Sequence, residues 1–445
     1  SILFIIFLIC IDIINMSFYS DQTLATRYLD PQTYVPKVRA SFVLDSSEAA
    51  YLPNMRLTFI GANTNAESTY AQLPGAAGGL IRNMRLLDGK TELSSISEFG
   101  WWKGFNNQST TNARAQAIVS NLACAAVGRT INGQTRKIAQ NVVLNKANTV
   151  TAGSQSAFMD LREVFPILNS VTHLPTSVFP NLRVEIEFNT SGALVNTNNT
   201  AAPEFNTLRP VLVVDVIENP TVVANLNKQM GDFSWREIEH DQFVIPAGIG
   251  LGAGGAVGAT GARVVQPVNV KLNGYNNKIV DRVLIVKEIQ DDWSTGAGLD
   301  VGFGRWGSAA CYNQVVQFRI NGSNILARNG MVGDNERLAY MVDTWGDQAN
   351  YTSSNLYSKT DADAILTHSG STNPSDWVGQ LDYIGCYLGK YINDFQLDYR
   401  RMGLQAGAGV NPTSKLLIGH VYAEVRKQFN FLPGGAGYNI SYTQE

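Results

Sequence analysis

The fold class is decided by the stretch Leu182-Arg183-Val184-Glu185-Ile186-Glu187-Phe188. Apolar and charged residues alternate in it, and this period of two predicts a strand with one buried and one wet face. Segments 38–43 and 315–320 repeat the alternation less cleanly, while 211–214 and 283–286 are continuous apolar runs typical of more buried strands. Turn dipeptides bound these runs, at Asp88-Gly89, Asn273-Gly274, Asn321-Gly322 and Asn329-Gly330. The chain is therefore predicted to be all-β and built of sandwiches.

Helical signal is confined to a few short stretches. Leu161, Val164, Phe165 and Leu168 have helical spacing and predict one short amphipathic helix around Pro166. The Ala-rich segment 111–124 predicts a second, and the Gly-rich run 248–261 predicts a long loop. Helices are expected only as short pieces in loops.

The composition indicates a folded protein with weakly charged surfaces. Its 445 residues exceed what one hydrophobic core holds, because single cores stop growing near about 250–300 residues. Only 16% of residues are charged, and depletion of charge is typical of surfaces that other subunits cover. The formal net charge is −3 and no dense Lys/Arg run occurs, so no specific binding of nucleic acid is predicted.

Three pairs of segments resemble each other in the same order along the two halves of the chain. Arg56-Leu57-Thr58-Phe59-Ile60 resembles Arg282-Val283-Leu284-Ile285-Val286. Arg85-Leu86-Leu87-Asp88-Gly89, followed by Leu93, resembles Arg319-Ile320-Asn321-Gly322, followed by Leu326. Segment 182–187 resembles segment 421–426. Together the pairs predict two tandem sandwiches joined near Glu218-Asn219-Pro220, with one unit over residues 21–219 and the other over 220–445.

A family resemblance rests on the region that precedes the predicted strand 182–188. It reads Asp160-Leu161-Arg162-Glu163-Val164-Phe165-Pro166-Ile167-Leu168, then Leu174-Pro175, then Phe179-Pro180-Asn181 and the strand 182–188. In order and spacing this region resembles the major capsid proteins of virophages and polinton-like viruses, in which a short helix precedes a late strand of the first jelly roll. Val421-Tyr422-Ala423-Glu424-Val425-Arg426-Lys427, with Tyr438 and Tyr442 behind it, resembles that family's final strand and tail. The resemblance covers nearly the whole chain after residue 20.

The resemblance implies a double jelly roll, two tandem eight-stranded sandwiches, related to the capsid proteins of large eukaryotic DNA viruses. Three copies would form a pseudo-hexagonal capsomer of an icosahedral shell. The implied partners are two further copies in a homotrimer, neighbouring capsomers, and penton and minor capsid proteins. The expected location is the virion capsid, assembled inside the host cell. The alternative is a carbohydrate-binding or carbohydrate-active jelly-roll protein, because Trp101-Trp102 with Phe99 and Phe105 could stack on a sugar.

Residues 1–20 form a hydrophobic N-terminal segment unlike the rest of the chain. Its apolar run, residues 2–14, would reach about 20 Å as a helix, against about 30 Å for a bilayer core, so it is expected not to span a membrane. Three roles stay open for it: packing under the protein shell, contact with an internal membrane, or an extension of the reading frame ahead of Met16.

The reactive residue types form no catalytic pattern, so the chain is predicted not to be an enzyme and to have no catalytic, cofactor-binding or metal-ligating residue. The histidines are expected to stand alone, without metal-ligand spacing: His173, His240, His368 and His420. The cysteines are expected to be buried free thiols: Cys10, Cys124, Cys311 and Cys386. Asp291-Asp292, Asp361 and Asp363 are interpreted as solvated loop carboxylates, and Glu185 and Glu187 as polar groups on one strand. The segment 250–255 fits a dinucleotide-binding glycine pattern only formally and is interpreted as a loop.

Overall fold

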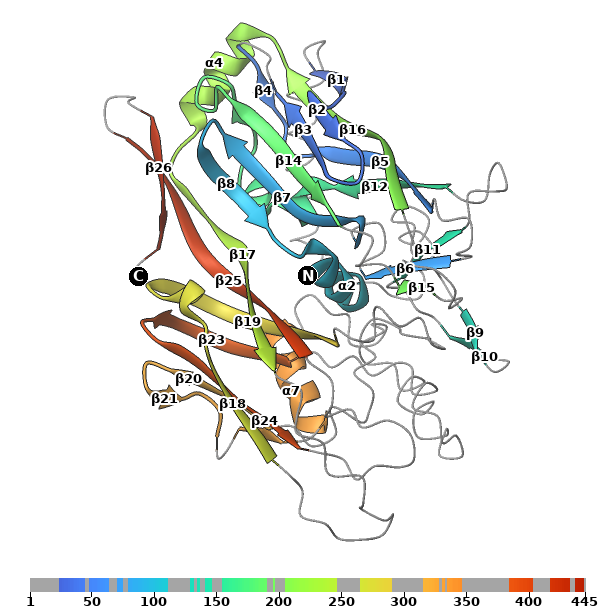
Figure 1. Cartoon of the computed structure of the whole chain (residues 1–445). Helices are drawn as coiled ribbons and strands as arrows, with labels where there is room; N and C mark the ends of the chain where they lie inside the picture. The colour runs from blue at the N-terminus through green and yellow to red at the C-terminus, as the bar shows by residue number, and fades with distance from the viewer. Residues whose placement is uncertain are drawn as a thin grey trace, which may run out of the picture.

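A computed structural model describes residues 24–44, 48–63, 70–74, 79–110, 129–131, 134–136, 141–145, 154–189, 195–196, 205–245, 265–289, 315–327, 330–332, 334–345, 384–402, 417–432 and 437–443. These residues form two β-sandwiches, the first at the top and the second at the bottom of Figure 1.

The first sandwich contains eight principal strands, β1 (Leu24–Leu29), β3 (Arg39–Val43), β5 (Arg56–Asn63), β7 (Ile81–Asp88), β8 (Thr91–Ile96), β12 (Ser154–Asp160), β14 (Leu182–Phe188) and β16 (Phe205–Ile217). One sheet has the order β1-β16-β5-β12 and the other the order β3-β14-β7-β8. In chain order the first, eighth, third and sixth strands face the second, seventh, fourth and fifth. This is the strand order of a jelly roll.

The second sandwich contains β17 (Phe233–Ile245), β18 (Val265–Lys271), β19 (Lys278–Ile289), β20 (Val315–Ile320), β21 (Ser323–Asn324), β22 (Met331–Val332), β23 (Ile384–Ile392), β24 (Phe395–Met402) and β25 (Leu417–Phe431). Its sheets have the orders β17-β25-β19-β23 and β18-β24-β20, and the short β21 and β22 both pair with β20 in the place of the fifth strand. The order of the first sandwich is thus repeated. The predicted all-β fold of two tandem eight-stranded jelly rolls is confirmed.

Shorter elements lie in the connections and at the sheet edges. The short strands are β2 (Thr33–Val35), β4 (Ala50–Tyr51), β6 (Tyr70–Pro74), β9 (Arg129–Ile131), β10 (Gln134–Arg136), β11 (Asn141–Asn145), β13 (Leu174–Pro175), β15 (Val195–Asn196) and β26 (Tyr438–Tyr442). The helical pieces are α2 (Phe99–Thr110), α4 (Pro220–Gln229), α7 (Asp334–Trp345) and the 3₁₀ turns η2 (Leu161–Glu163), η3 (Pro166–Asn169) and η5 (Asn273–Tyr275). Within the described residues, no helix is long and apolar enough to cross a bilayer.

The alternation of apolar and charged residues in the sequence of β14 corresponds to the alternation of buried and outward-facing side chains along the strand. The apolar residues of β14 are buried in the core of the first sandwich, whereas Glu185 and Glu187 lie on its outer face. There Glu185 accepts a hydrogen bond from Arg85 at 2.7 Å, and Glu187 accepts one from Asn83 at 2.5 Å. The interpretation of both glutamates as polar groups on a wet face is confirmed.

Two predicted turn dipeptides connect neighbouring strands. Gly89, with φ +58°, lies between β7 and β8. Asn321 and Gly322, with φ +51° and +80°, lie between β20 and β21. Positive φ at both central residues is the geometry of a tight hairpin turn, and Asn-Gly adopts it at little steric cost.

Of the three segment pairs, two are confirmed and one is wrong. Arg56–Ile60 and its partner lie on β5 and β19, the third strands of their sandwiches, and the second pair lies on β7 and β20, the fourth strands. The third pair joins β14, a seventh strand, to β25, an eighth strand. The true counterpart of β14 is β24, which lies between β18 and β20 as β14 lies between β3 and β7.

The single helix predicted around Pro166 is also wrong. Two 3₁₀ turns replace it, with Phe165 in an extended conformation between them. A proline has no backbone N–H to donate and disfavours helical geometry in the residue before it. The apolar residues that suggested the helix are nevertheless all buried. The predicted helix at 111–124, the loop at 248–261 and the N-terminal segment lie outside the described residues.

Candidate functional site

The two sandwiches pack against each other along a seam. The seam comprises the contacts of α2, β8, η3 and the η3–β14 loop with β17, β25, β26 and α7. Its apolar part is continuous with the core of the first sandwich, since one cluster of buried residues includes both that core and Trp235, Ile238, Leu284, Val286, Met341, Trp345, Tyr422 and Phe429. The second sandwich has its own separate core. The seam is therefore a buried interface rather than a loose contact between two domains.

Aromatic rings from α2 form one end of the seam. The Trp102 ring lies 5.7 Å from that of Trp345 and 5.6 Å from that of Tyr422, measured between centroids. Trp101 stacks on His420 at 5.2 Å. Offset and edge-on aromatic pairs of this kind add to the stabilisation that burial alone supplies. Both tryptophans are under 8% exposed, so the feature that suggested sugar binding belongs to the protein interior.

His240 and His420 contact each other beside this aromatic cluster. Nε2 of His240 lies 3.1 Å from Nδ1 of His420, and the two rings stack. Burial, together with the nearby His420, lowers the pKa of His240 to about 3. The expectation that each histidine stands alone is wrong for this pair. His240 lies on the first strand of the jelly roll and His420 on the eighth, and these strands are neighbours only in the folded sheet.

A buried group of ions lies on the same sheet of the second sandwich. Arg282 on β19 donates to both carboxylate oxygens of Glu424 on β25, at 2.7 and 3.2 Å. Its guanidinium also donates to the backbone oxygen of Thr344 at 3.0 Å and lies 4.1 Å from the centre of the Trp345 ring. Arginine suits such a site because its planar fork can pair with a carboxylate and stack on a ring at once. The pair thereby ties α7 to the sheet.

Glu237 is a fully buried carboxyl at the seam. It accepts hydrogen bonds from Ser94 Oγ of β8 and from Trp235 Nε1, both at 2.7 Å. Burial raises the pKa of Glu237 above its ordinary value. Because Ser94 belongs to the first sandwich, this carboxyl joins the two sandwiches by a buried polar contact.

The β25–β26 hairpin forms the opposite end of the seam. Figure 1 shows β25 running from the lower sandwich past the upper one, with β26 beside it. The Phe429 and Tyr438 rings of this hairpin both pack on Phe179 of the first sandwich, with centroids 5.7 and 5.2 Å away. The Tyr438 hydroxyl donates to Asp88 at 2.8 Å, and the Tyr442 hydroxyl donates to Glu239 at 2.8 Å.

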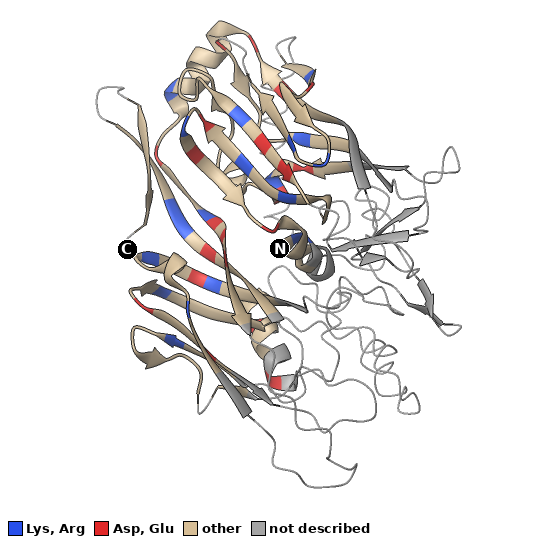
Figure 2. Cartoon of the chain, in the orientation of Figure 1, with Lys and Arg blue, Asp and Glu red and all other residues tan. Residues whose placement is uncertain are grey.

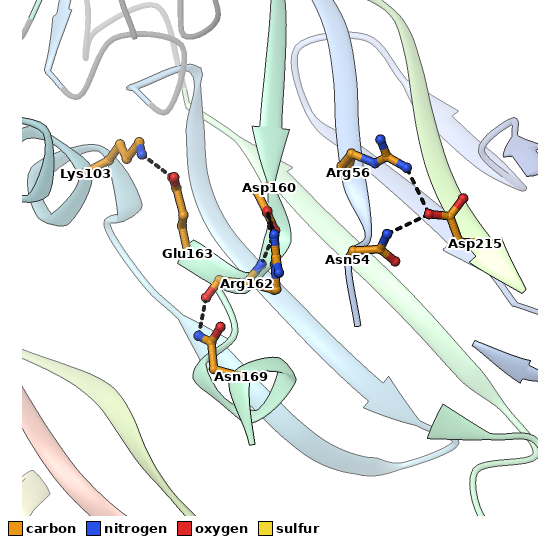
Figure 3. A network of polar contacts seen from close by, with 8 residues as sticks. All are labelled: Asn54, Arg56, Lys103, Asp160, Arg162, Glu163, Asn169 and Asp215. Atoms are coloured by element: carbon orange, nitrogen blue, oxygen red, sulfur yellow. Dashed lines mark hydrogen bonds and ion pairs between the residues drawn. The ribbon is translucent and has the colours of Figure 1, made fainter. Parts of the chain in front are cut away.

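A polar network holds the loop that carries the family resemblance (Figure 3). Asp160 caps η2 by accepting from the backbone N–H of Arg162 at 2.9 Å, and it also pairs with the Arg162 guanidinium at 2.6 Å. Asn169 donates to the backbone oxygen of Arg162 at 2.9 Å. Lys103 of α2 forms an ion pair with Glu163. The loop is thus fixed between the end of β12 and the helix that fills the seam.

A hollow of about 800 Å³ lies where η3 faces β17 and β25. Arg236 and Arg426 line it, and both pair with the buried Asp281, at 3.1 and 2.6 Å. Asp232 also lines the hollow. The positive and negative groups around the hollow therefore balance, and its lining assigns it no ligand class.

The other candidate residues are dispersed. His173 is buried with its Nδ1 2.8 Å from the Thr172 hydroxyl, and burial lowers its pKa. Cys386 is a buried free thiol whose pKa burial raises to about 12. Over the described ranges, no three His, Cys, Asp or Glu side chains are placed to hold a metal ion. Several candidates lie outside those ranges: His368, Cys10, Cys124, Cys311, Asp291, Asp292, Asp361, Asp363 and the loop 250–255.

Comparison with known proteins finds similarity in structure alone. No family model matches the sequence, and no curated protein matches it. The PBCV-1 protein VP54, which has been fitted into a reconstruction of the virophage Sputnik, superposes with a TM-score of 0.54 at 10% identity, covering 94% of this chain and 97% of that one. The mavirus major capsid protein gives 0.51 at 8%, covering 96% and 91%, and the Faustovirus major capsid protein gives 0.50 at 8%, covering 91% and 90%. Over nearly its whole length, the chain has the double jelly-roll fold of these viral capsid proteins.

Proposed function

We propose that the chain is a major capsid protein, the building block of pseudo-hexagonal trimeric capsomers in the icosahedral shell of a DNA virus. The observation that carries the proposal is the repetition of one jelly-roll strand order twice in a single chain. Two similar units per chain give three chains six similar sides, which suits close packing on a shell. The solved structures with this fold include capsid proteins over matching lengths, which supports the proposal.

The buried seam supports the same role. The building block of a symmetric shell must keep one shape, which requires a fixed angle between its two sandwiches. The tryptophan cluster at one end and the β25–β26 hairpin at the other contact both sandwiches. An interface fixed at two separated ends resists hinge motion better than a linker does.

We further propose units over residues 21–219 and 220–445, preceded by a hydrophobic segment over 1–20. Support for the division comes from the chain between β16 and β17, where Asn219 caps α4 by accepting from the backbone N–H groups of Thr221 and Val222. The proposed partners are two further copies, neighbouring capsomers, and penton and minor capsid proteins, while packing under the shell and contact with an internal membrane both stay open for the first segment. The proposed location is the virion capsid, with assembly inside the host cell.

We also propose that no residue of the chain carries catalysis. Three buried ionisable groups of the described residues have structural partners: Glu237 joins the sandwiches, Arg282 pairs with Glu424, and Asp281 pairs with Arg426.

Mass in solution and electron microscopy test the proposal together. The purified chain is expected to sediment as a trimer that persists on dilution, and purified particles are expected to show a hexagonal lattice of capsomers built from it. A well-folded chain that stays monomeric at nanomolar concentration, or particles that lack it in the lattice, would contradict the proposal. Turnover of a glycan that is abolished by one carboxylate substitution would instead favour the carbohydrate-active alternative.

A further inference from the structure

The outer face of β17-β25-β19-β23 is covered within the chain. Tyr422 of β25 points away from the core of its own sandwich, yet it is fully buried. Helix α2 of the first sandwich lies over the part of the face around Tyr422, and α7 lies over the part nearer β23 (Figure 1). By contrast, the outer face of β1-β16-β5-β12 carries the exposed Tyr28 and Phe158 beside the neutral pair of Arg56 and Asp215. The cover therefore depends on where α2 and α7 lie.

The sequence of α2 favours a helix only weakly. It includes Gly100, Gly104 and Asn106, and it has no acidic residue in its first turn and no basic residue in its last. The residue before a helix ordinarily has an extended backbone and a short polar side chain that accepts from the first turn. The residue before α2 is Glu98, whose φ is +50° and whose carboxylate accepts from Arg82 at 2.9 Å instead. The stability of α2 must therefore come from contacts outside the helix.

The two sandwiches together hold Glu98 in its left-handed conformation. This conformation is unfavourable for a residue with a side chain and persists only where surrounding contacts fix it. From the first sandwich, Asn83 Oδ1 accepts from the backbone N–H of Glu98 at 3.3 Å, and Arg82 binds the carboxylate from β7, whose row of charges Figure 2 shows. From the second sandwich, the Tyr422 hydroxyl donates to the carbonyl oxygen of Glu98 at 2.6 Å. The two ends of one strained residue are thus fixed by different sandwiches.

We infer that the corner between β8 and α2 is a conformational latch, in which α2 is helical only while Tyr422 of the second sandwich holds Glu98. Without that hold, Glu98 relaxes to a negative φ, the first turn of α2 loses its direction, and a helix of weak propensity opens. The inference goes beyond the proposed function, since it concerns a single chain.

The latch makes the place of α2 conditional on the packing of the two sandwiches. The first sandwich is synthesised before the second, and domains generally fold in that order. A chain whose second sandwich has not yet folded therefore has no ordered α2 and leaves Trp101 and Trp102 uncovered. The helix closes over the seam only when both sandwiches are complete.

The first test is amide exchange of α2 in the full chain carrying Tyr422→Phe. This change removes the hydroxyl and keeps the ring, and the carbonyl of Glu98 still accepts from the backbone N–H of Trp101 at 3.1 Å. Exchange of the α2 amides should become roughly tenfold faster, the effect of losing one buried hydrogen bond on local opening. The matched control is Tyr275→Phe, which removes a buried hydroxyl that donates to the backbone oxygen of Val421 at 2.8 Å within the second sandwich. It should leave α2 exchange unchanged.

The second test separates backbone strain from side-chain contacts. Glu98→Gly and Glu98→Ala both remove the pair with Arg82, but only glycine adopts a φ of +50° at no steric cost. Exchange of α2 should therefore be roughly tenfold slower in Glu98→Gly than in Glu98→Ala. Combined with Tyr422→Phe, Glu98→Gly should restore most of the lost protection, because no strain is left for the hydroxyl to hold.

Faster α2 exchange in Tyr422→Phe alone, reversed by Glu98→Gly, would support the latch. Unchanged α2 exchange in a folded Tyr422→Phe would overturn it, and so would equal exchange in Glu98→Gly and Glu98→Ala. If Tyr422→Phe fails to fold, the Glu98 variants decide, because that side chain contacts Arg82 at the surface and its removal leaves both cores intact.

Discussion

The outer faces of β17-β25-β19-β23 and β1-β16-β5-β12 differ in what lies on them, although the two sheets have the same strand order. The first carries a buried ion pair, two histidines and a tyrosine beneath α2 and α7. The second carries an exposed tyrosine and phenylalanine beside a small neutral cluster. The same strand order therefore does not give the two sheets the same outer surface, because the packing of the two sandwiches makes one of these faces interior.

Removing a ring from the covered face should give the largest effect. Trp102→Ala deletes contacts with Phe105, Trp345 and Tyr422 and should lower the free energy of unfolding by about 3–5 kcal/mol, the range for a large buried aromatic. Denaturant unfolding measures the loss. The exposed Val38→Ala of the first sandwich should change stability by less than about 0.5 kcal/mol. Equal losses in the two variants would mean that the seam contributes no more than surface does.

Matched ion pairs sharpen the comparison between the sandwiches. Arg282 and Glu424 lie directly opposite each other on neighbouring strands, as Arg85 and Glu185 do, but the first pair is buried and the second largely exposed. Arg282→Met leaves a buried carboxylate and should cost about 3 kcal/mol or more, whereas Arg85→Met should cost less than about 1 kcal/mol. Unfolding in urea at two salt concentrations measures both variants. A larger cost for Arg85→Met would contradict the assignment of Arg282 to the interior.

The strands could be predicted from the sequence, whereas the contacts of the seam could not, and the reason is physical. Alternation and turn dipeptides are local signals, so β14 and the Asn321-Gly322 turn could be predicted. The third segment pair failed because apolar residues spaced around a glutamate occur in both β14 and β25, and strands of unlike position can share such a pattern. No local pattern in the sequence indicates that His240 contacts His420, or that Ser94 of the first sandwich donates to Glu237 of the second. Only the jelly-roll strand order makes the first and eighth strands neighbours.

Helix α2 is a second element that could not be predicted from local sequence. Its segment contains Gly100, Gly104 and Asn106, which are poor helix formers, so propensity gave no indication of a helix there. Packing of Trp101 and Trp102 against the second sandwich supplies the stabilisation that propensity lacks. An aromatic pair in a weak helical sequence could have indicated a packed interface, but it could not have indicated with which strand.

Lowering the pH should destabilise the fold through His240, which lies on the covered face of β17-β25-β19-β23. Its pKa is near 6.5 in an unfolded chain and about 3 in the folded one, so the folded state binds fewer protons below pH 6.5. Its contribution to stability is complete above that pH and is lost progressively as pH falls towards 3, which amounts to about 2 kcal/mol between pH 7 and pH 5. His240→Phe should flatten this part of the pH dependence. Denaturant unfolding from pH 7 to pH 5 measures the difference between the two proteins.

The difference between wild type and variant is needed because other groups titrate too. Burial raises the pKa of Glu237, so its contribution has the opposite sign and is lost as pH rises through the folded-state value. Glu237 is present in both proteins and cancels in the comparison. The His420 and Tyr422 rings, which face His240, also stay in place. An unchanged slope in His240→Phe would place the histidine in contact with water and contradict its burial.

The smallest effect concerns the hairpin that ends the described chain. Tyr438 and Tyr442 both lie on β26, but Tyr438 donates to Asp88 of the first sandwich and Tyr442 to Glu239 of the second. Removing either hydroxyl as Tyr→Phe should cost about 1 kcal/mol, because each bond is partly exposed and ends on a carboxylate. The two variants should differ in which region loosens. Tyr438→Phe removes a bond between the sandwiches and should speed amide exchange around the β7–β8 turn, where Asp88 also accepts from the backbone N–H of Asn181 at 2.8 Å. Tyr442→Phe should leave amide exchange at that turn unchanged. Equal acceleration of exchange there in both variants would contradict the prediction, because it would show that the Tyr438–Asp88 and Tyr442–Glu239 hydrogen bonds do not act independently.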